Sequence, residues 1–253
     1  MCLIMFAYQE REDIPLLLAA NRDEFHARPT RAAGFWPELP QLLAGKDLQA
    51  GGTWLGVTRQ GRFAAITNFR DPSRTGAAPR SRGELTLDFL SGTAPAAEYI
   101  ARIQPLEDQY AGFNLLLGDQ RELWYYSNAG GGARELGPGI YGLSNALLDT
   151  AWPKVELGHR ALRAALRRAP THDGLARTLA DRGIASEAGL ALQGLEGEME
   201  RRLSAQFIVD PVYGTRATTT LWIDGRGEVN FRETSFNGDG MATGRVEERF
   251  CVR

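Results

Sequence analysis

The chain has 253 residues, 43% of them hydrophobic, and its 29 basic and 31 acidic side chains give a formal net charge of −2. Such a chain can bury a sizeable core, and we expect one domain over residues 1–253. The balanced charge gives no support for a nucleic-acid partner. The first apolar run is too short for a signal-peptide core or a membrane helix, so the sequence predicts a cytoplasmic protein without membrane insertion. The oligomeric state is left open.

The N-terminal part of the chain predicts a β-hairpin. Two apolar runs, Leu3–Tyr8 and Ile14–Ala20, flank a charged connection over Gln9–Asp13. Antiparallel pairing about this connection would place Cys2 near Ala20. The Asn-Arg-Asp sequence that follows the second run would then lie within one or two residues of the Cys2 thiol.

Cys2 directly follows Met1. An initiator methionine is normally removed when the next residue is small, and its removal would give Cys2 a free α-amine. Such an amine has a pKa of about 7.7–8.0 and can act as a general base for the thiol on the same residue. This combination of nucleophile and base is the arrangement of the N-terminal-nucleophile (Ntn) hydrolases. Position alone, however, favours an apolar residue that starts a buried strand.

The segment after the hairpin is predicted to begin with loops and then to alternate between hairpins and helices. Phe35-Trp36-Pro37 and Gly51-Gly52 indicate loops. The expected elements that follow are a hairpin of Thr53–Arg59 with Arg62–Thr67, a helix from Ser81 to about Leu90, a helix over Ala94–Ile103, and a hairpin of Gly112–Leu117 with Glu122–Ser127. We expect the two helices to pack on one face of a sheet.

The second half of the chain predicts one more strand, several helices and a strand-rich end. The expected elements are a strand over Gly139–Asn145, a helix over Ala151–Ala169 capped by Thr150, a shorter helix that begins at Thr171, a helix at Arg201–Ser204, and strands over Thr218–Ile223, Glu228–Thr234 and Arg245–Val252. Strands at both ends with helices between them fit a sandwich of two antiparallel sheets covered by helices. The pattern leaves other α+β arrangements open.

Eight short motifs resemble the NRDE family, whose eukaryotic members are called transport and Golgi organisation proteins. They occur in the family's order: MCLI, AANRDEF, GGTWLG, ITN, RGEL, AGFNL, YGLSNALL and YGTRATTT. The resemblance covers nearly the whole chain. The family is in turn similar to Ntn hydrolases that cleave linear amides, such as choloylglycine hydrolases and penicillin V acylases. This implies an αββα sandwich of two stacked antiparallel sheets with helices on both outer faces.

The resemblance to those hydrolases also implies a site around the N-terminal cysteine. Its members are Cys2, Arg22, Asp23, Asn68, Asn145 and Arg216. The Asn145 side-chain amide and the backbone N–H that follows Asn68, which belongs to Phe69, are the implied donors to the oxyanion of an acyl-transfer intermediate. Arg216 is the implied cation that lowers the pKa of the thiol.

Arg22 and Asp23 stand at a departure from the hydrolase pattern, which reads Arg-Asn-x-Asp. The position three before Asp23 is Ala20 here, but Arg22 lies on the same strand face as Ala20 and could fill the same role. Asp23 could accept a hydrogen bond from the α-ammonium or the thiol and so orient Cys2.

The remaining cysteine and the histidines give no evidence of a metal site. Cys2 and Cys251 are the two cysteines, which suits a reducing compartment, although one bridge between them stays open. His26, His159 and His172 are isolated in the sequence, and we expect each to lie on the surface.

Two functions remain. The first is an Ntn-type cysteine hydrolase of a linear, non-peptide amide, which requires no cofactor. The second is a protein that binds and traffics haem or another apolar ligand, such as a lipid or acyl-CoA, without turnover; aromatic residues could line its cleft. A retained Met1 blocks the Cys2 nitrogen, so we also expect Met1, where present, to lie in or across the pocket.

Overall fold

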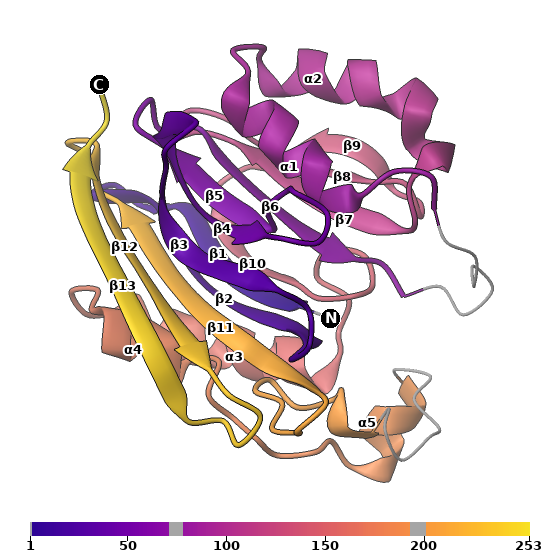
Figure 1. Ribbon diagram of the computed structural model, residues 1–253. Helices are drawn as coiled ribbons and strands as arrows, with labels where there is room; N and C mark the ends of the chain where they lie inside the picture. Colours follow the sequence, from indigo (N-terminus) through magenta and orange to yellow (C-terminus); the bar gives the residue numbers. More distant parts are fainter. Residues whose placement is uncertain (1, 71–77, 193–200) are drawn as a thin grey trace.

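The computed structural model describes residues 2–70, 78–192 and 201–253 (Figure 1). In this part of the chain the strands form two sheets with antiparallel pairing throughout. The order of sheet A is β10 (Gly139–Leu143), β1 (Cys2–Arg11), β2 (Ile14–Phe25), β11 (Tyr213–Ile223), β12 (Glu228–Phe236) and β13 (Ala242–Cys251). The order of sheet B is β3 (Thr30–Trp36), β4 (Leu39–Asp47), β5 (Leu55–Thr58), β6 (Phe63–Asn68), β7 (Phe113–Gly118), β8 (Leu123–Ser127) and β9 (Gly132–Glu135).

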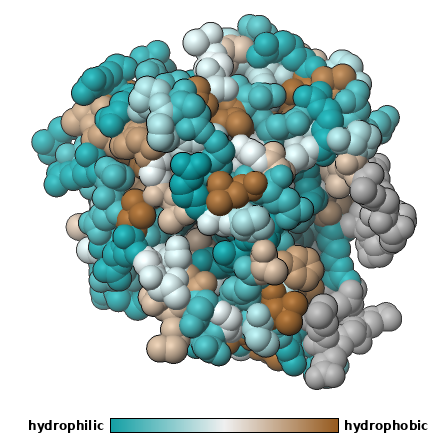
Figure 2. All heavy atoms as spheres, in the orientation of Figure 1, coloured by the Kyte–Doolittle hydropathy of each residue, from teal (hydrophilic) through white to brown (hydrophobic). Residues whose placement is uncertain are grey.

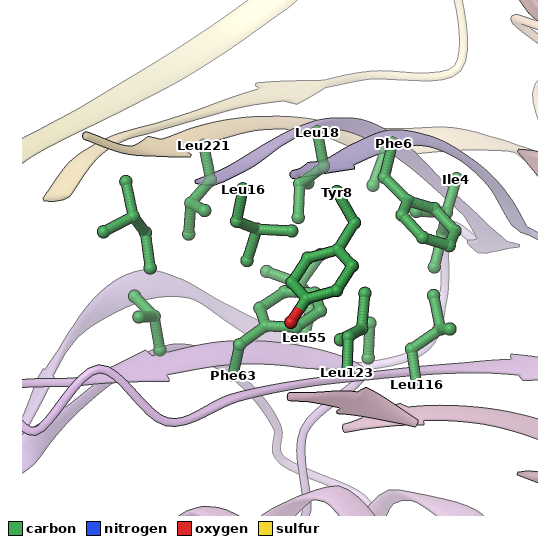
Figure 3. Packing of buried hydrophobic residues seen from close by; sticks show 14 of the residues in the cluster. Ile4, Phe6, Tyr8, Leu16, Leu18, Leu55, Phe63, Leu116, Leu123 and Leu221 are labelled. Carbon is green, nitrogen blue, oxygen red and sulfur yellow. The ribbon is translucent and has the colours of Figure 1, made fainter. Parts of the chain in front are cut away.

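The main hydrophobic core lies between the two sheets. Side chains alternate along a strand, so Ile4, Phe6 and Tyr8 of β1 all enter this core. Figure 3 shows them opposite residues of sheet B such as Leu116 and Leu123. The predicted apolar runs therefore form the inner face of the sandwich.

Helices cover the outer face of each sheet (Figure 1). On sheet B, α1 (Arg82–Ser91) and α2 (Ala96–Ile103) share a buried cluster with the strands, and the 3₁₀ helix η1 (Gln104–Gln109) continues α2. On sheet A, α3 (Pro153–Ala165) and α4 (His172–Arg177) share a buried cluster with residues of β1 and β2 such as Met5 and Leu17, and α5 (Glu187–Leu192) follows. The αββα sandwich predicted from the resemblance is confirmed.

The register of the first hairpin differs from the prediction by two residues. Cys2 pairs with Arg22 rather than with Ala20, and Tyr8 pairs with Leu16. The strands continue to Arg11, so the turn is shorter than predicted, and an irregularity between Tyr8 and Arg11 shifts the pairing. The expected proximity of the Asn-Arg-Asp sequence to Cys2 is confirmed.

Five elements were not predicted. The segment expected as loops contains the hairpin of β3 and β4, whose pairing is interrupted twice. The strand β9 and the helices η1 and α5 were also missed. β3 and β9 are the edge strands of sheet B, and β9 is fully exposed, so neither of these two strands shows a regular apolar period.

Two details of the helices also differ from the prediction. The N-cap of α3 is Trp152, whereas Thr150 donates to the carbonyl of Leu147. Thr171 does cap α4, because its hydroxyl accepts from the N–H of Gly174. None of the described helices is long and apolar enough to cross a membrane. Hydrophilic residues cover most of the face seen in Figure 2, with hydrophobic residues scattered between them.

Candidate active site

Cys2 is the first residue of β1, and its side chain lies on the strand face that is directed into the space between the sheets. It continues the row of Ile4 and Phe6, and it lies where this row leaves the hydrophobic core. The thiol lines a cavity of about 530 Å³. Described residues of β2, β4, β6 and α1 and of the connection before β5 form the rest of the wall. The cavity therefore opens at the end of the sandwich, between both sheets.

The surroundings of the thiol set its protonation state. Burial raises the pKa of the Cys2 thiol above its usual value, and the negative charge of Asp23 acts in the same direction. A hydrogen bond from the backbone N–H of Asp23 and the positive charge of Arg22 oppose this increase in pKa. Because the pKa remains raised, the thiol is neutral at rest, and a base is needed to form the nucleophilic thiolate.

Arg22 lies beside Cys2 on the inner face of sheet A, as expected from the alternation along β2. Only 6% of the residue is exposed. Its guanidinium lies 4.0 Å from the ring centroid of Trp54 in the facing sheet's β4–β5 connection and donates to the hydroxyl of Thr30 at 3.1 Å. Burial lowers the pKa of Arg22, and the charge of Cys2 is the largest effect that opposes this decrease. The stacking on Trp54 fixes a cation next to the thiol.

Asp23 also lies next to Cys2, but its side chain lies on the opposite face of β2 from the side chain of Arg22. It is 3% exposed, and the hydroxyl of Thr215 donates to its carboxylate at 2.7 Å. Burial raises the pKa of Asp23 to about 6. Asn21, two residues earlier, bonds to the carbonyls of Leu179 and Gln206 and accepts from Thr218. Asn21 thus supports β2, while Asp23 contributes its N–H and its charge to the site.

Lys154 is a buried cation near Asp23 that the sequence reasoning missed, and it lies outside the described wall of the Cys2 cavity. It comes from the first turn of α3, is 2% exposed, and donates to the carbonyl of Leu203 at 2.9 Å. Burial lowers the pKa of Lys154 to about 8, and the charge of Asp23, followed by that of Cys2, opposes this decrease. Its neighbours Trp152 and Val155 are buried as well, so Lys154 lies on the buried side of the start of α3.

The two asparagines expected as oxyanion donors are both present, but in different roles. The side chain of Asn145 is buried, and its amide donates to the backbone carbonyl of Asn68 at 2.8 Å. Asn145 is not among the described residues of the cavity wall, whereas Asn68 is. The N–H of Phe69 already donates to the carbonyl of Gly112 at 2.8 Å, and so the geometry does not support its expected role. The side chain of Asn68 makes no hydrogen bond to a described residue and is the available donor.

Arg216 is not brought to the thiol. It occupies an irregularity of β11 between Thr215 and Ala217, and its guanidinium donates to the carbonyls of Phe25 and Arg28 at 3.0 and 2.7 Å. It contributes to a separate cavity of about 190 Å³ that shares Arg22 and Trp54 with the first. The role expected for Arg216 at Cys2 is therefore not supported by the geometry.

Three other expectations concern cysteines, histidines and Met1. Cys2 and Cys251 are both free thiols, so the bridge left open by the sequence is absent. His172 is buried beside Thr220 and not on the surface. In the described part of the chain, no group of three or more His, Cys, Asp and Glu side chains could hold a metal ion. The expected position of Met1 across the pocket lies outside the described residues.

Fold and site together define an α+β sandwich protein with a cysteine-centred cavity at the end of the space between its sheets. A family model for Transport and Golgi organisation 2 matches residues 1–238, so the chain belongs to that family, as the NRDE resemblance predicted. The chain is 37% identical to the Transport and Golgi organization protein 2 homolog of Bos taurus, over 94% of each chain. It is also 37% identical to the human homolog, over 93% of each chain.

Similar solved structures have much lower sequence identity. An N-acylethanolamine-hydrolyzing acid amidase ortholog of Caenorhabditis elegans has a TM-score of 0.49 at 10% identity, covering 87% of this chain and 92% of its own. A mutant conjugated bile acid hydrolase of Clostridium perfringens has a TM-score of 0.44 at 10% identity, covering 99% and 97%.

Proposed function

We propose that this protein is a cysteine amide hydrolase that acts on a linear, non-peptide amide, with Cys2 as the nucleophile after removal of Met1. The observation that carries the proposal is the environment of the Cys2 thiol. It lines a cavity large enough for a small molecule, next to the buried cation of Arg22 and the N–H of Asp23. Both groups favour the thiolate form.

The burial of the thiol makes a local base necessary, and the α-amine of a processed Cys2 would supply it. In the proposed reaction the amine accepts the thiol proton as sulfur attacks the amide carbonyl carbon. The leaving amine departs with that proton, which leaves a thioester on Cys2. Water then adds to the thioester and gives one proton to the α-amine, and this proton passes to the sulfur as the C–S bond breaks and the carboxylic acid is released.

The neighbouring residues have separate roles in this proposal. Arg22 stabilises the thiolate, and the side-chain amide of Asn68 donates to the oxyanion. Asp23 accepts a hydrogen bond from the α-ammonium, and the charge of Lys154 favours its ionised form. Asn145 holds the end of β6 so that Asn68 faces the cavity.

A substrate screen tests the proposal. N-acyl amides of different acyl and amine groups are incubated with Met1-free protein and with Cys2→Ala, and the released amine is measured. We expect release by the wild type and none by Cys2→Ala. Equal release by both proteins would reject Cys2 as the nucleophile.

The alternative is a carrier of haem or another apolar ligand. The thiol of Cys2 is one group in the cavity that could ligate haem iron. The wall fits a macrocycle poorly, however, because seven of its described residues are charged: Arg22, Asp23, Glu24, Arg28, Asp47, Arg80 and Arg82. Titration with haemin tests this alternative, since a saturable Soret shift that is lost in Cys2→Ala would support the carrier.

A further inference from the structure

The strand β13 forms a free edge of sheet A. It pairs on one side with β12, and no other described strand pairs with it. Figure 1 shows it as the outermost strand of the sheet, with no described element along its other side. Its regular part begins at Gly244, after an irregularity in the pairing, and Phe250 near its end packs against Phe35 of sheet B. The middle of the strand is therefore open to pairing with a further strand.

The hydrogen bonds to β12 define which residues of β13 face the free edge. The N–H of Val252 donates to the carbonyl of Gly227 at 2.8 Å, and this pair continues the register of the two strands. Hydrogen-bonded pairs alternate along an antiparallel ladder, so the even-numbered residues in the regular part of β13 bond to β12. The N–H and C=O groups of Arg245, Glu247 and Arg249 therefore point to the free edge.

The charges on the outer face of β13 are incompletely paired. Glu247 accepts from Arg232 through Oε2 at 2.9 Å, and its Oε1 has no described partner. The guanidinium of Arg245 is exposed and forms no ion pair or hydrogen bond with a described residue. Because Arg245 and Glu247 lie two positions apart, their side chains are on the same face of the strand. The same strand thus carries an unpaired cation and an available carboxylate oxygen.

A second copy of β13 matches this charge pattern. A two-fold axis perpendicular to the sheet pairs two identical edge strands antiparallel and keeps the core faces of both copies on the same side. With the axis at Val246, Arg245 of each copy lies opposite Glu247 of the other. Opposite residues in such a ladder have Cβ atoms about 4.5–5.5 Å apart, which is within ion-pair reach of these side chains. Their outward N–H and C=O groups also face each other and can complete the ladder.

The neighbouring registers place like charges opposite each other. An axis at Arg245, at Glu247 or at Glu248 brings that residue opposite its own copy. Like charges directly opposite in a ladder are destabilising. An axis at Val246 instead brings an apolar, β-branched side chain opposite its own copy, and no like charges face each other. The charge pattern therefore selects this register among the four.

We propose that β13 is an interaction surface for a second copy of this chain, and that two copies join their A sheets edge to edge about an axis at Val246. Each Arg245–Glu247 pair adds backbone hydrogen bonds and an ion pair between the copies. The strand lies beyond residue 238, where the match to the family model ends. No residue of β13 is in the described wall of the Cys2 cavity, so the dimer does not depend on the reaction proposed for Cys2.

Analytical ultracentrifugation of the full chain from about 5 to about 500 µM tests for the dimer, because a small edge interface gives a weak, concentration-dependent association. The mass should rise from the 27.8 kDa of one chain towards that of two. Arg245→Glu places a carboxylate opposite Glu247, and Glu247→Arg places a guanidinium opposite Arg245. Each variant should raise the dimer Kd about tenfold or more. An equimolar mixture of the two restores opposite charges at both pairs and should dimerise within about threefold of the wild-type affinity.

Arg249→Glu is the matched control. It reverses the charge of another exposed arginine on the same strand face, one that the register does not place opposite a charge, and should leave the dimer Kd within about threefold of the wild type. Circular dichroism verifies that each variant folds. A wild type that stays monomeric, single variants that dimerise like the wild type, or a mixture that stays monomeric would overturn the proposal. Loss of the dimer in Arg249→Glu but not in Arg245→Glu would also overturn it, because the axis would then lie elsewhere.

Discussion

The side-chain amide of Asn145 donates to the backbone carbonyl of Asn68 at 2.8 Å, and this bond joins the ends of β10 and β6, which belong to different sheets. The N–H of Arg70 donates back to the carbonyl of Asn145 at 2.7 Å. The two sheets are therefore linked at the cavity by one asparagine, while the other keeps its side chain available. This assigns a structural role to Asn145 and a chemical role to Asn68.

These roles predict opposite mutant profiles. Asn145→Ala leaves the part-buried Asn68 carbonyl without this partner and should lower the free energy of unfolding by about 1–3 kcal/mol. Asn68→Ala should change stability little but lower kcat by about 10²–10³-fold, as expected for loss of an oxyanion donor. Urea unfolding and amide-hydrolysis kinetics measure the two effects. A large loss of stability in Asn68→Ala, with kcat unaffected, would contradict the assignment.

Arg22→Met should raise the pKa of the Cys2 thiol, because it removes the cation that favours the thiolate. The rate of iodoacetamide alkylation as a function of pH reports this pKa, and a Cys251→Ser background removes the other thiol. Arg28→Met is the control, because Arg28 is paired with Asp47 and should leave the profile close to that of the wild type. An unchanged profile in Arg22→Met would show that Arg22 does not act on the thiol.

His172 should destabilise the protein in acid. Its ring lies 2.7 Å from the Thr220 hydroxyl and 4.5 Å from the Trp222 ring, and burial lowers the pKa of His172 to about 4. The folded-state pKa lies below the unfolded value of about 6.5, so the stability due to neutral His172 is present above pH 6.5 and is lost as the pH falls towards 4. His172→Gln should remove this loss, which amounts to at most about 1.4 kcal/mol per pH unit.

Asp23 acts with the opposite sign over part of the same range. Its folded-state pKa of about 6 lies above the unfolded value, so the folded state takes up the proton first and is favoured as the pH falls from 6 towards 4. Unfolding free energies of wild type, His172→Gln and Asp23→Asn from pH 7 to 4.5 should therefore diverge, with the steepest loss in Asp23→Asn. Parallel curves for the three proteins would show that neither group controls the acid response.

Gly52 should not tolerate a side chain. A Cβ atom there would lie 2.4 Å from the backbone of Gly83, where α1 begins beside the cavity. Gly52→Ala should cost about 1–3 kcal/mol of stability, because backbone must move to relieve the clash. Gly34→Ala is the control, since a Cβ at Gly34 meets nothing within 4 Å, and it should be near neutral. Thermal melting compares the two variants, and equal melting temperatures would disprove the close contact.

The sequence predicted the elements with a strong apolar period and left out those without one. The core strands β1 and β2 follow from their apolar runs. Helix α1 follows from the capping sequence that begins at Ser81, although the Ser81 side chain makes no cap hydrogen bond. The hairpin of β3 and β4 could not be predicted, because its exposed residues and interrupted pairing hide the period of two. The register of Cys2 was off by two residues, because the irregularity after Tyr8 has no sequence signature.

The candidate site could also be predicted only in part. Cys2, Arg22 and Asp23 lie together because one hairpin carries them. Lys154 and Arg82 arrive from helices on opposite outer faces, and no local pattern shows which residue of a helix reaches the end of the sandwich. The N–H of Phe69 and the guanidinium of Arg216 both donate to nearby carbonyls, which only the folded chain reveals.

The central claim is that an unblocked Cys2 forms an acyl-enzyme. The most direct measurement is intact-mass analysis after incubation with an activated N-acyl anilide, in a Cys251→Ser background. Met1-free protein should gain the mass of one acyl group, located on the Cys2 peptide by fragmentation. The same protein with an N-terminal extension that blocks the Cys2 nitrogen should gain none. Equal acylation of both forms, or acylation at a residue other than Cys2, would contradict the account.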